Sequence, residues 1–266
     1  MTTAPIITLT TDFGLRDPFV GIMKGVILGI CREAQLVDLT HELAAHDVRE
    51  GMLALESSWR FFPAGSVHLA VIDPGVGSRR RALALRAGGH CFVGPDNGLF
   101  TFALASENWS AVSLETEAYR LPQVSRTFHG RDIFAPAAGH LACGVPLDRL
   151  GPELRDPARI PMPGCRCEGE DLVGEVIASD RFGNLITSIT ALRLDEIAPR
   201  GEVVVEIAGR QLARMAASYA EGPAGVPALI LGSAGRLEIF VKEGSARAVL
   251  DAGPGTPVRV RRVPAP

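Results

Sequence analysis

The sequence predicts an α/β N-terminal domain with a mostly parallel sheet, followed by a smaller all-β, barrel-like C-terminal domain. Strand-like and helix-like patterns alternate over residues 1–155, which favours a parallel sheet. Residues 170–266 instead hold short strand-like runs separated by turn residues, as in hairpins of an antiparallel sheet or barrel. Between them, residues 156–169 are rich in Pro, Gly and Arg, so we expect a linker there.

In the first domain, apolar and β-branched runs predict strands over residues 6–9, 67–72, 82–85 and 91–93. Asp17 followed by Pro18 predicts the start of a helix that continues to about residue 30. A second helix is predicted by apolar residues at steps of four and three, namely Val48, Met52, Leu55, Trp59 and Phe62. Asp47 and Glu50 resemble the capping box that would begin it.

A third helix is predicted over residues 132–143, with Asp132 most simply its N-cap. In the second domain, strand-like runs are found over residues 172–178, 185–189, 202–208, 227–232, 236–241 and 257–263. They have the lengths and turn residues of hairpins.

The composition is that of an ordinary globular enzyme-sized chain. It has 266 residues, 47% of them hydrophobic, and a formal net charge of −3, which gives no electrostatic basis for binding nucleic acid. No apolar stretch reaches the roughly 20 residues that span a bilayer. Five cysteines, without zinc-finger spacing around Cys165 and Cys167, predict neither a disulfide framework nor a metal site. We expect a cytoplasmic protein.

Four polar, Gly-containing loops follow or join the predicted strands of the first domain, at residues 11–14, 73–80, 95–98 and 127–132. In α/β sheets ligands bind outside the carboxyl ends of strands, where such loops meet. Taken singly, Asp12 and Asp73 could be turn formers, and His129 could be an ordinary surface or core histidine. Their joint placement at strand ends favours a site, and Arg80 is spaced to fold back onto Asp73 as an ion pair.

The 73–80 loop has neither Walker A nor Rossmann spacing. In the second domain, residues 180–184 (DRFGN) predict a hairpin turn, which accounts for Gly183 and Asn184. A turn does not account for Phe182 at its tip, which favours stacking or burial. Ser233 and Glu238, which flank another turn, are open to either interpretation.

In sequence order, nearly the whole chain resembles the S-adenosylmethionine hydroxide adenosyltransferase family, whose relatives include fluorinases and chlorinases. The matching segments are TDFG, VGIMKG, DLTHEL, DVREG, FFPAGSVHLAVIDPGVGS, GPDNGLFT, TFHGRDIFAPAAGHLA, SDRFGNLITSI and GSAGRLEIFVKEGSA. DPGVGS together with FHGRDIFAP is the most specific combination. The resemblance implies the same two domains and a homotrimer with sites at subunit interfaces.

The resemblance also implies hydrolysis of S-adenosylmethionine to adenosine and methionine, by attack of water on the ribose C5′. No cofactor is implied, because the nucleoside is the substrate. The implied catalytic residues are Asp73, Arg80 and His129, with either His129 or Asp73 taking the proton from water. The implied substrate-binding residues are Asp12 at the ribose, Phe182, Asn184 and Tyr219 at adenine, and Asp180, Ser233 and Glu238 at the methionine end.

Three alternatives are open at this point. The chain could be an adenosine- or S-adenosylmethionine-binding regulatory module without useful turnover, although nucleoside recognition does not need the Asp73, Arg80 and His129 combination. A halide-using relative is disfavoured, because the halogenating enzymes carry Tyr at the positions of Asp73 and His129, and the fluorinase carries Ser at the position of Gly130. A metal-dependent hydrolase finds no support in clustered ligand residues.

Overall fold

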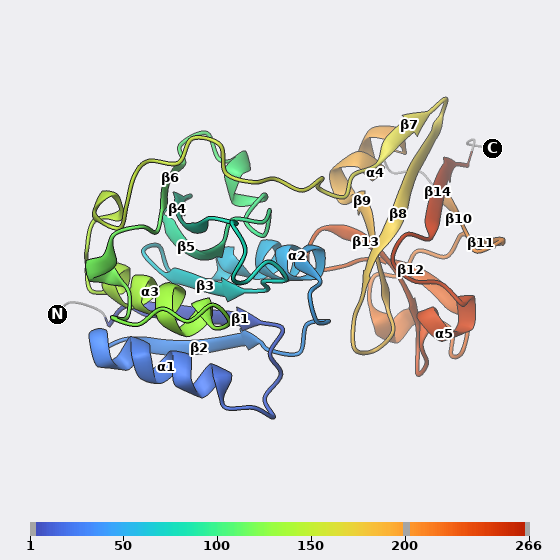
Figure 1. Ribbon diagram of the computed structural model, residues 1–266. Helices are drawn as coiled ribbons and strands as arrows, with labels where there is room; N and C mark the ends of the chain where they lie inside the picture. The colour runs from blue at the N-terminus through green and yellow to red at the C-terminus, as the bar shows by residue number, and fades with distance from the viewer. Residues whose placement is uncertain (1–3, 199–202, 264–266) are drawn as a thin grey trace. The chain divides into compact units, whose positions relative to one another are not determined.

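The computed structural model describes residues 4–198 and 203–263 of the chain. It divides into two compact units, Met1–Met162 and Pro163–Pro266, within the segment predicted as a linker (Figure 1). The first unit is α/β with a mostly parallel sheet, and the second is built on an antiparallel, barrel-like sheet, which confirms the predicted fold class.

The part of the first unit that the structure describes, residues 4–162, contains six strands and three α-helices. The strands are β1 (Ile6–Thr11), β2 (Gln35–Thr40), β3 (Val67–Val71), β4 (Ala82–Ala87), β5 (His90–Pro95) and β6 (Ser110–Ser113). The helices are α1 (Phe19–Ile30), α2 (Val48–Ser58) and α3 (Ala135–Ala142). The sheet order is β2-β1-β3-β5-β4-β6, and β4 is the strand that pairs antiparallel with both of its neighbours.

Alternating side chains of this sheet pack on helices at both faces. Helices α1 and α3 cover one face, where Met23 and Ile27 of α1 join a buried cluster with Ile7 and Leu9 of β1. Helix α2 covers the other face, where its Met52 and Leu55 pack in a second cluster. Because β3 and β5 are buried on both faces, their sequences show the largely apolar runs typical of central strands.

The N-cap of α2 is the clearest local prediction that the structure confirms. The Asp47 side chain accepts a hydrogen bond from the Glu50 backbone N–H at 2.9 Å. The reciprocal half of the predicted capping box is absent, since the Glu50 carboxylate accepts from the Ala44 N–H at 2.8 Å instead.

Several local predictions were wrong or incomplete. Helix α1 begins at Phe19 with Pro18 as its N-cap, so Asp17 does not cap it. Asp132 is not an N-cap: it lies in a turn of π-helix, Gly130–Phe134, that leads into α3, and it is fully buried. Strands β2 and β6 were missed, because an edge strand such as β2 buries little and carries no strong apolar pattern.

Within residues 163–198 and 203–263, the second unit holds eight strands and two short α-helices. The strands are β7 (Arg166–Glu168), β8 (Asp171–Ser179), β9 (Leu185–Thr190), β10 (Val203–Ile207), β11 (Arg210–Leu212), β12 (Pro227–Leu231), β13 (Arg236–Val241) and β14 (Pro257–Arg262). The helices are α4 (Ala191–Ile197) and α5 (Ala246–Leu250).

The sheet of this unit runs β11-β10-β14-β8-β9-β13-β12, with β7 paired to β8. The three-residue strands β7 and β11 were missed, and residue 202, the predicted start of one strand, lies outside the described residues. Long strands of the sheet curl around one buried cluster that includes Val176, Leu185 and Val258.

Gly77 joins two loops that are far apart in the sequence. Its φ of 77° lies in the left-handed region, and a Cβ built on it would meet the Arg126 carbonyl oxygen at 2.4 Å. Only a glycine lets the 73–80 loop approach this backbone so closely. The contact fixes that loop beside the segment that leads to His129.

Two buried histidines lie side by side in the sheet. His68 of β3 is within 2.8 Å of the Thr8 hydroxyl through Nδ1, and its Nε2 is 3.1 Å from Nδ1 of His90. Burial, followed by the proximity of His90, lowers the pKa of His68 to about 3, and burial also lowers the pKa of His90. Both rings are therefore neutral in the folded unit at neutral pH.

Replacing Gly77 with Ala should destabilise the first unit by about 1–3 kcal/mol or more. An alanine at this position would combine the cost of a positive φ with a clash between its Cβ and the Arg126 carbonyl oxygen. Gly89→Ala is the matched control: its φ is also positive, at 81°, but the nearest atom to its Cβ is 3.7 Å away. Urea unfolding followed by tryptophan fluorescence measures this unit, because both tryptophans, Trp59 and Trp109, belong to it. Equal losses in the two variants would contradict the proposed contact.

The first unit should lose stability as the pH falls below about 6.5, the ordinary histidine value. Between pH 6.5 and about 3, the unfolded chain binds a proton at His68 that the folded unit does not, so unfolding becomes favoured as acid is added. At pH 5 this one residue should cost about 2 kcal/mol. Urea unfolding at pH 7.5 and pH 5 should show a smaller loss in His68→Asn than in a control, His46→Asn, at an exposed histidine.

Candidate active site

Asp12 and Asp73 follow neighbouring strands at one edge of the first sheet. Strand β1 pairs parallel with β3, and Thr11 is paired with Val71. Asp12 lies one residue past that pair, and Asp73 lies two residues past it. The predicted convergence of loops at the carboxyl ends of strands is therefore present here.

Asp73, Arg80 and His129 form one cluster. The Arg80 Nε donates to Asp73 Oδ1 at 2.8 Å, and its Nη2 donates to Asp73 Oδ2, so the predicted ion pair is confirmed as a two-pronged contact. The same Nη2 is 2.8 Å from His129 Nδ1. The side chains of Asp73 and Arg80 are 5% and 10% exposed, which shields their interaction from water.

The donors of Arg80 determine which ring nitrogen of His129 carries a proton. A guanidinium has N–H donors and no acceptor, so Nδ1 of His129 must accept and cannot be protonated in this arrangement. The proton of the neutral ring is then on Nε2. Burial is the largest cause that lowers the pKa of His129, and the positive charge of Arg80 is the next; Asp73 opposes them. The ring is neutral at neutral pH.

Residues that the sequence did not single out support this cluster. The Arg80 guanidinium lies over the Phe134 ring, with Cζ 5.1 Å from its centroid, and Arg80 Nη1 donates to the Arg81 carbonyl at 3.3 Å. Asp132 accepts from the Ser125 N–H at 2.8 Å and so orders the segment before His129. No sequence signal indicated this role, because Asp132 was predicted to be an N-cap.

The Asp12 carboxylate lies apart from these contacts. Its Oδ2 accepts from the His46 backbone N–H at 2.8 Å, and the residue is partly exposed. No hydrogen bond connects it with Asp73, Arg80 or His129 among the described residues.

In the second unit, the Asp180–Asn184 turn is held by the Asp180 carboxylate. Its Oδ1 accepts from the N–H groups of Phe182 and Asn184 at 2.9 and 2.8 Å, and its Oδ2 accepts from the Asn184 side chain at 2.8 Å. Phe182 is 77% exposed at the tip of this turn, whereas Asn184 is buried. The Phe182 ring is therefore neither buried nor stacked on a partner among the described residues of its own unit.

Glu238 and Tyr219 form a second polar contact near this turn. The Tyr219 hydroxyl donates to Glu238 Oε2 at 2.9 Å, and the Tyr219 ring packs edge-on against Phe240. Burial raises the pKa of Glu238, as does the charge of Asp180, while the Tyr219 hydrogen bond lowers it. Burial, followed by the contact with Glu238, raises the pKa of Tyr219 to about 12. In the β9–β13 pair Glu238 lies opposite Ile186, two residues past Asn184, so this contact lies beside the turn.

Ser233 is exposed in the β12–β13 turn, where the adjacent Gly232 approaches the Glu238 carboxylate so closely that a Cβ would meet Oε1 at 1.8 Å. The structure thus assembles Asp180, Asn184, Tyr219 and Glu238 in the second unit and places Ser233 beside Glu238. Phe182 shares the turn with Asp180 and points out of it.

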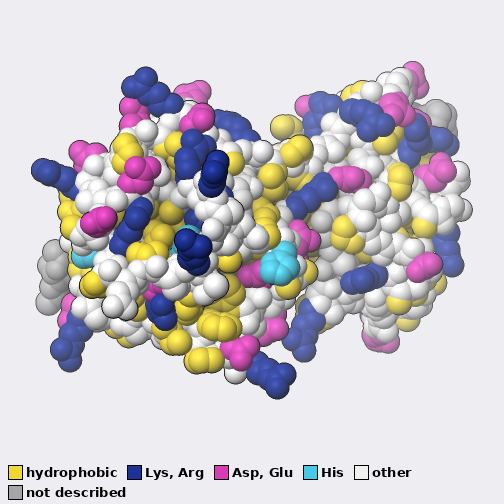
Figure 2. Space-filling model, in the orientation of Figure 1, with side chains coloured by type: hydrophobic (Ala, Val, Ile, Leu, Met, Phe, Trp, Pro, Cys, Tyr) yellow, Lys and Arg dark blue, Asp and Glu magenta, His cyan; other side chains and the backbone are white. Residues whose placement is uncertain are grey.

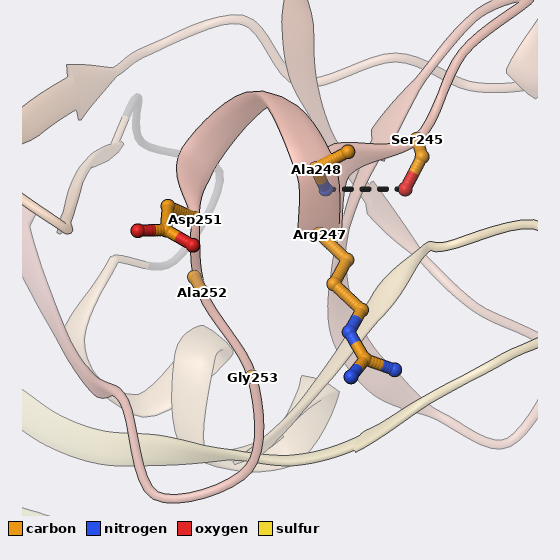
Figure 3. A pocket seen from close by; sticks show the side chains of 6 residues that line it. All are labelled: Ser245, Arg247, Ala248, Asp251, Ala252 and Gly253. Atoms are coloured by element: carbon orange, nitrogen blue, oxygen red, sulfur yellow. Dashed lines mark hydrogen bonds between the residues drawn. The ribbon is translucent and has the colours of Figure 1, made fainter.

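A pocket of about 410 Å³ lies behind the Asp180–Asn184 turn and is lined by Ser245, Arg247, Ala248, Asp251, Ala252 and Gly253 (Figure 3). In it, the Ser245 hydroxyl caps α5 by accepting from the Ala248 N–H at 3.2 Å. The Arg247 N–H donates to the Gly183 carbonyl at 2.9 Å. A Cβ on Gly183 would meet Ser245 Oγ at 2.0 Å, so this wall of the pocket supports the turn.

Three wider features bear on the class of protein. On the face shown in Figure 2, Lys and Arg side chains are scattered among acidic and apolar ones and do not gather in one patch. Within residues 4–198 and 203–263, no group of three or more His, Cys, Asp or Glu side chains has the arrangement of a metal site. None of the helices described is long and apolar enough to cross a membrane.

Comparison with known proteins gives relatives over nearly the full length of the chain. An (R)-S-adenosyl-L-methionine hydrolase of Thermus thermophilus is 45% identical over 258 residues, which are 94% of this chain and 97% of the relative. The protein of the same name from Salinispora arenicola is 38% identical, over 98% of this chain and 99% of the relative. A fluorinase of Actinopolyspora mzabensis is 31% identical over 70% of this chain and 71% of the relative.

Among solved structures, an uncharacterized conserved protein from Thermotoga maritima is similar with a TM-score of 0.90 and 34% identity, over 96% of this chain and all of that one. The family model described as the SAM hydroxide adenosyltransferase N-terminal domain matches residues 7–151, and the model of its C-terminal domain matches residues 174–259. The chain therefore belongs to the SAM hydroxide adenosyltransferase family.

Proposed function

We propose that the buried Asp73–Arg80–His129 cluster activates water for hydrolysis of S-adenosylmethionine to adenosine and methionine. Relatives named (R)-S-adenosyl-L-methionine hydrolase, 38–45% identical over nearly the whole chain, carry the reaction and substrate to this protein. The single observation that supports the mechanism is Arg80 Nη2, which contacts both the Asp73 carboxylate and His129 Nδ1.

The chemical difficulty lies with the nucleophile. Methionine leaves the ribose C5′ as a neutral thioether, so its departure needs no acid. Bulk water has a pKa of about 15.7 and must lose a proton as it attacks. A positioned base contributes about 10²–10⁴-fold to such a step, and near-attack geometry supplies about 7–11 kcal/mol.

Asp73 is the proton acceptor in this proposal, and His129 orients the water. His129 uses the lone pair of Nδ1 on Arg80, and its Nε2 carries a proton, so the neutral ring has no second lone pair with which to act as a base. Each Asp73 oxygen accepts from Arg80 and keeps a further lone pair. Arg80 fixes the position of the carboxylate that takes the proton from water.

The remaining predicted residues are proposed to bind the substrate. Asp12 accepts hydrogen bonds from the ribose hydroxyls, and its position beside Asp73 at the sheet edge supports this. The acidic pair Asp180 and Glu238, with Ser233, suits the ammonium and carboxylate of the methionine end. Phe182, Tyr219 and Asn184 are proposed at adenine; the exposed Phe182 ring is available for stacking.

Water rather than halide is the proposed nucleophile. A carboxylate beside the reacting carbon repels an anion, and Arg80 holds the Asp73 carboxylate in place. Gly130, the position of Ser in the fluorinase, is closely packed: a Cβ there would meet Met23 Sδ at 3.1 Å and the Phe128 ring at 3.2 Å.

We further propose that the protein is a cytoplasmic homotrimer that places its sites at subunit interfaces and binds no nucleic acid. The support is the family, the presence of candidate groups on both units, and the scattered basic residues of Figure 2. Light scattering coupled to size exclusion measures the assembly directly, and a monomeric mass would contradict it.

Asp73→Asn should lower kcat by about 10²–10⁴-fold with a small effect on KM, because an amide cannot accept the proton of water. Adenosine released from S-adenosylmethionine, separated by chromatography, is the measurement. Asp156→Asn is the matched control, since Asp156 pairs with the neighbouring Arg81 and is 82% exposed. Normal turnover in Asp73→Asn would remove this carboxylate from the chemistry, and absence of adenosine from the unmodified protein would favour a binding module.

The acid limb of kcat/KM should lie below pH 6.5. Because the pKa of His129 is lowered, its neutral, active form is present above that pKa and is lost as the pH falls through it. His129→Asn retains an acceptor for Arg80 and does not titrate, so its profile should lack this limb. Rates measured from pH 4.5 to 9 test the idea; an unchanged limb in the variant would refute it.

A further inference from the structure

A buried chain of polar side chains stands behind Asp12, separate from the Asp73 cluster. The Thr11 hydroxyl is 2.9 Å from Nδ1 of His41, and Nε2 of His41 is 3.0 Å from Asp38 Oδ1. The other Asp38 oxygen accepts from Lys24 Nζ at 2.6 Å. Thr11 is fully buried and His41 is 3% exposed, so the inner half of this chain is shielded from water.

Each end of this chain has a further partner. Burial raises the pKa of Asp38, but the hydrogen bond from Lys24 and the proximity of His41 lower it by more, so the carboxylate is ionised. At the other end, Thr11 Oγ1 accepts from the Phe13 N–H at 3.2 Å besides its hydrogen bond with Nδ1 of His41.

The backbone of His41 completes the connection. Its carbonyl accepts from the Gly14 N–H at 2.7 Å, and five residues further on the His46 N–H donates to Asp12 Oδ2. The residues around Asp12 in its loop, Thr11, Phe13 and Gly14, are thus connected to the segment that begins with His41. Thr11 and Gly14 contact His41 directly, and Phe13 is connected through Thr11. The carboxylate is fixed from the residue before it and from the two after it.

Burying these polar side chains costs folding free energy, which favours a functional reason for the arrangement. Burying a histidine and a threonine hydroxyl requires that their polar atoms be paired, and apolar residues of similar volume would fill the same space without that requirement. Ligand-binding groups must be held within about 0.5 Å of their productive position by their supporting contacts. The chain supplies that support to a side chain at the very end of β1.

We propose that His41 is a positioning residue of the nucleoside subsite, which acts through Thr11 and the Gly14 N–H to hold the Asp12 carboxylate where it accepts both ribose hydroxyls. The inference rests on the proposed binding role of Asp12. It assigns a task in the reaction to a residue that contacts neither substrate nor the reacting atoms.

The test compares the affinity of the full chain for adenosine and for 2′,3′-dideoxyadenosine by calorimetry. Hydrogen bonds to a charged group make the unmodified protein prefer adenosine, by about tenfold or more. Thr11→Val removes the hydroxyl with little change in shape and should reduce this preference at least threefold, as should His41→Asn. Thr11→Ser keeps the hydroxyl and should retain the preference.

Thr8→Val is the matched control, because it deletes another buried threonine–histidine contact on β1, at 2.8 Å, away from the strand end. It should lower stability and leave the preference unchanged. A Thr11→Val protein that binds both nucleosides more weakly but with the original preference would assign His41 a merely structural role and overturn the inference. If Asp12→Asn also leaves the preference unchanged, the binding role of Asp12 itself fails, which separates the two ideas.

Discussion

The one-sided hydrogen bonding of Arg80 is the constraint on which the candidate active site depends. Because a guanidinium only donates, every group that it contacts must be an acceptor: Asp73 as a carboxylate and His129 through an unprotonated Nδ1. One buried side chain therefore sets the charge of its first partner and the tautomer of its second. A lysine would place a positive charge here but could not bridge both acceptors in the same plane.

The sheet supplies this cluster with a rigid base. Neighbouring parallel strands end at Asp12 and Asp73, and Gly77 lets the 73–80 loop lie against the segment before His129. The candidate site residues are then held by backbone that is itself packed on both faces of the sheet. Ordinary core packing therefore holds the site residues in place. The turn of π-helix at Gly130–Phe134 begins directly after His129 and helps to orient it.

Local sequence signals predicted those parts of the structure that are governed by local physics. The α2 stripe, the Asp47 cap and the apolar central strands follow from periodicity and burial, and the 73–80 spacing was enough to pair Asp73 with Arg80. Local signals could not predict roles that depend on residues far away in the chain. The contact of His41 with Thr11 spans thirty residues, and no local pattern around His41 predicts it. The resemblance in motifs identified residues, but not which ring nitrogen carries the proton.

The contact between Gly183 and the start of α5 has a consequence for how the protein is made. The Asp180–Asn184 turn leans on Ser245 and Arg247, which lie more than sixty positions later in the chain. During synthesis from the N-terminus, domains fold as units in the order in which they emerge. The sheet that carries Asp73, Arg80 and His129 is complete within the first unit, whereas the turn that carries Phe182 acquires its support when the last segment leaves the ribosome. Truncation near the C-terminus would thus release a chain with an intact first unit and an unbraced turn.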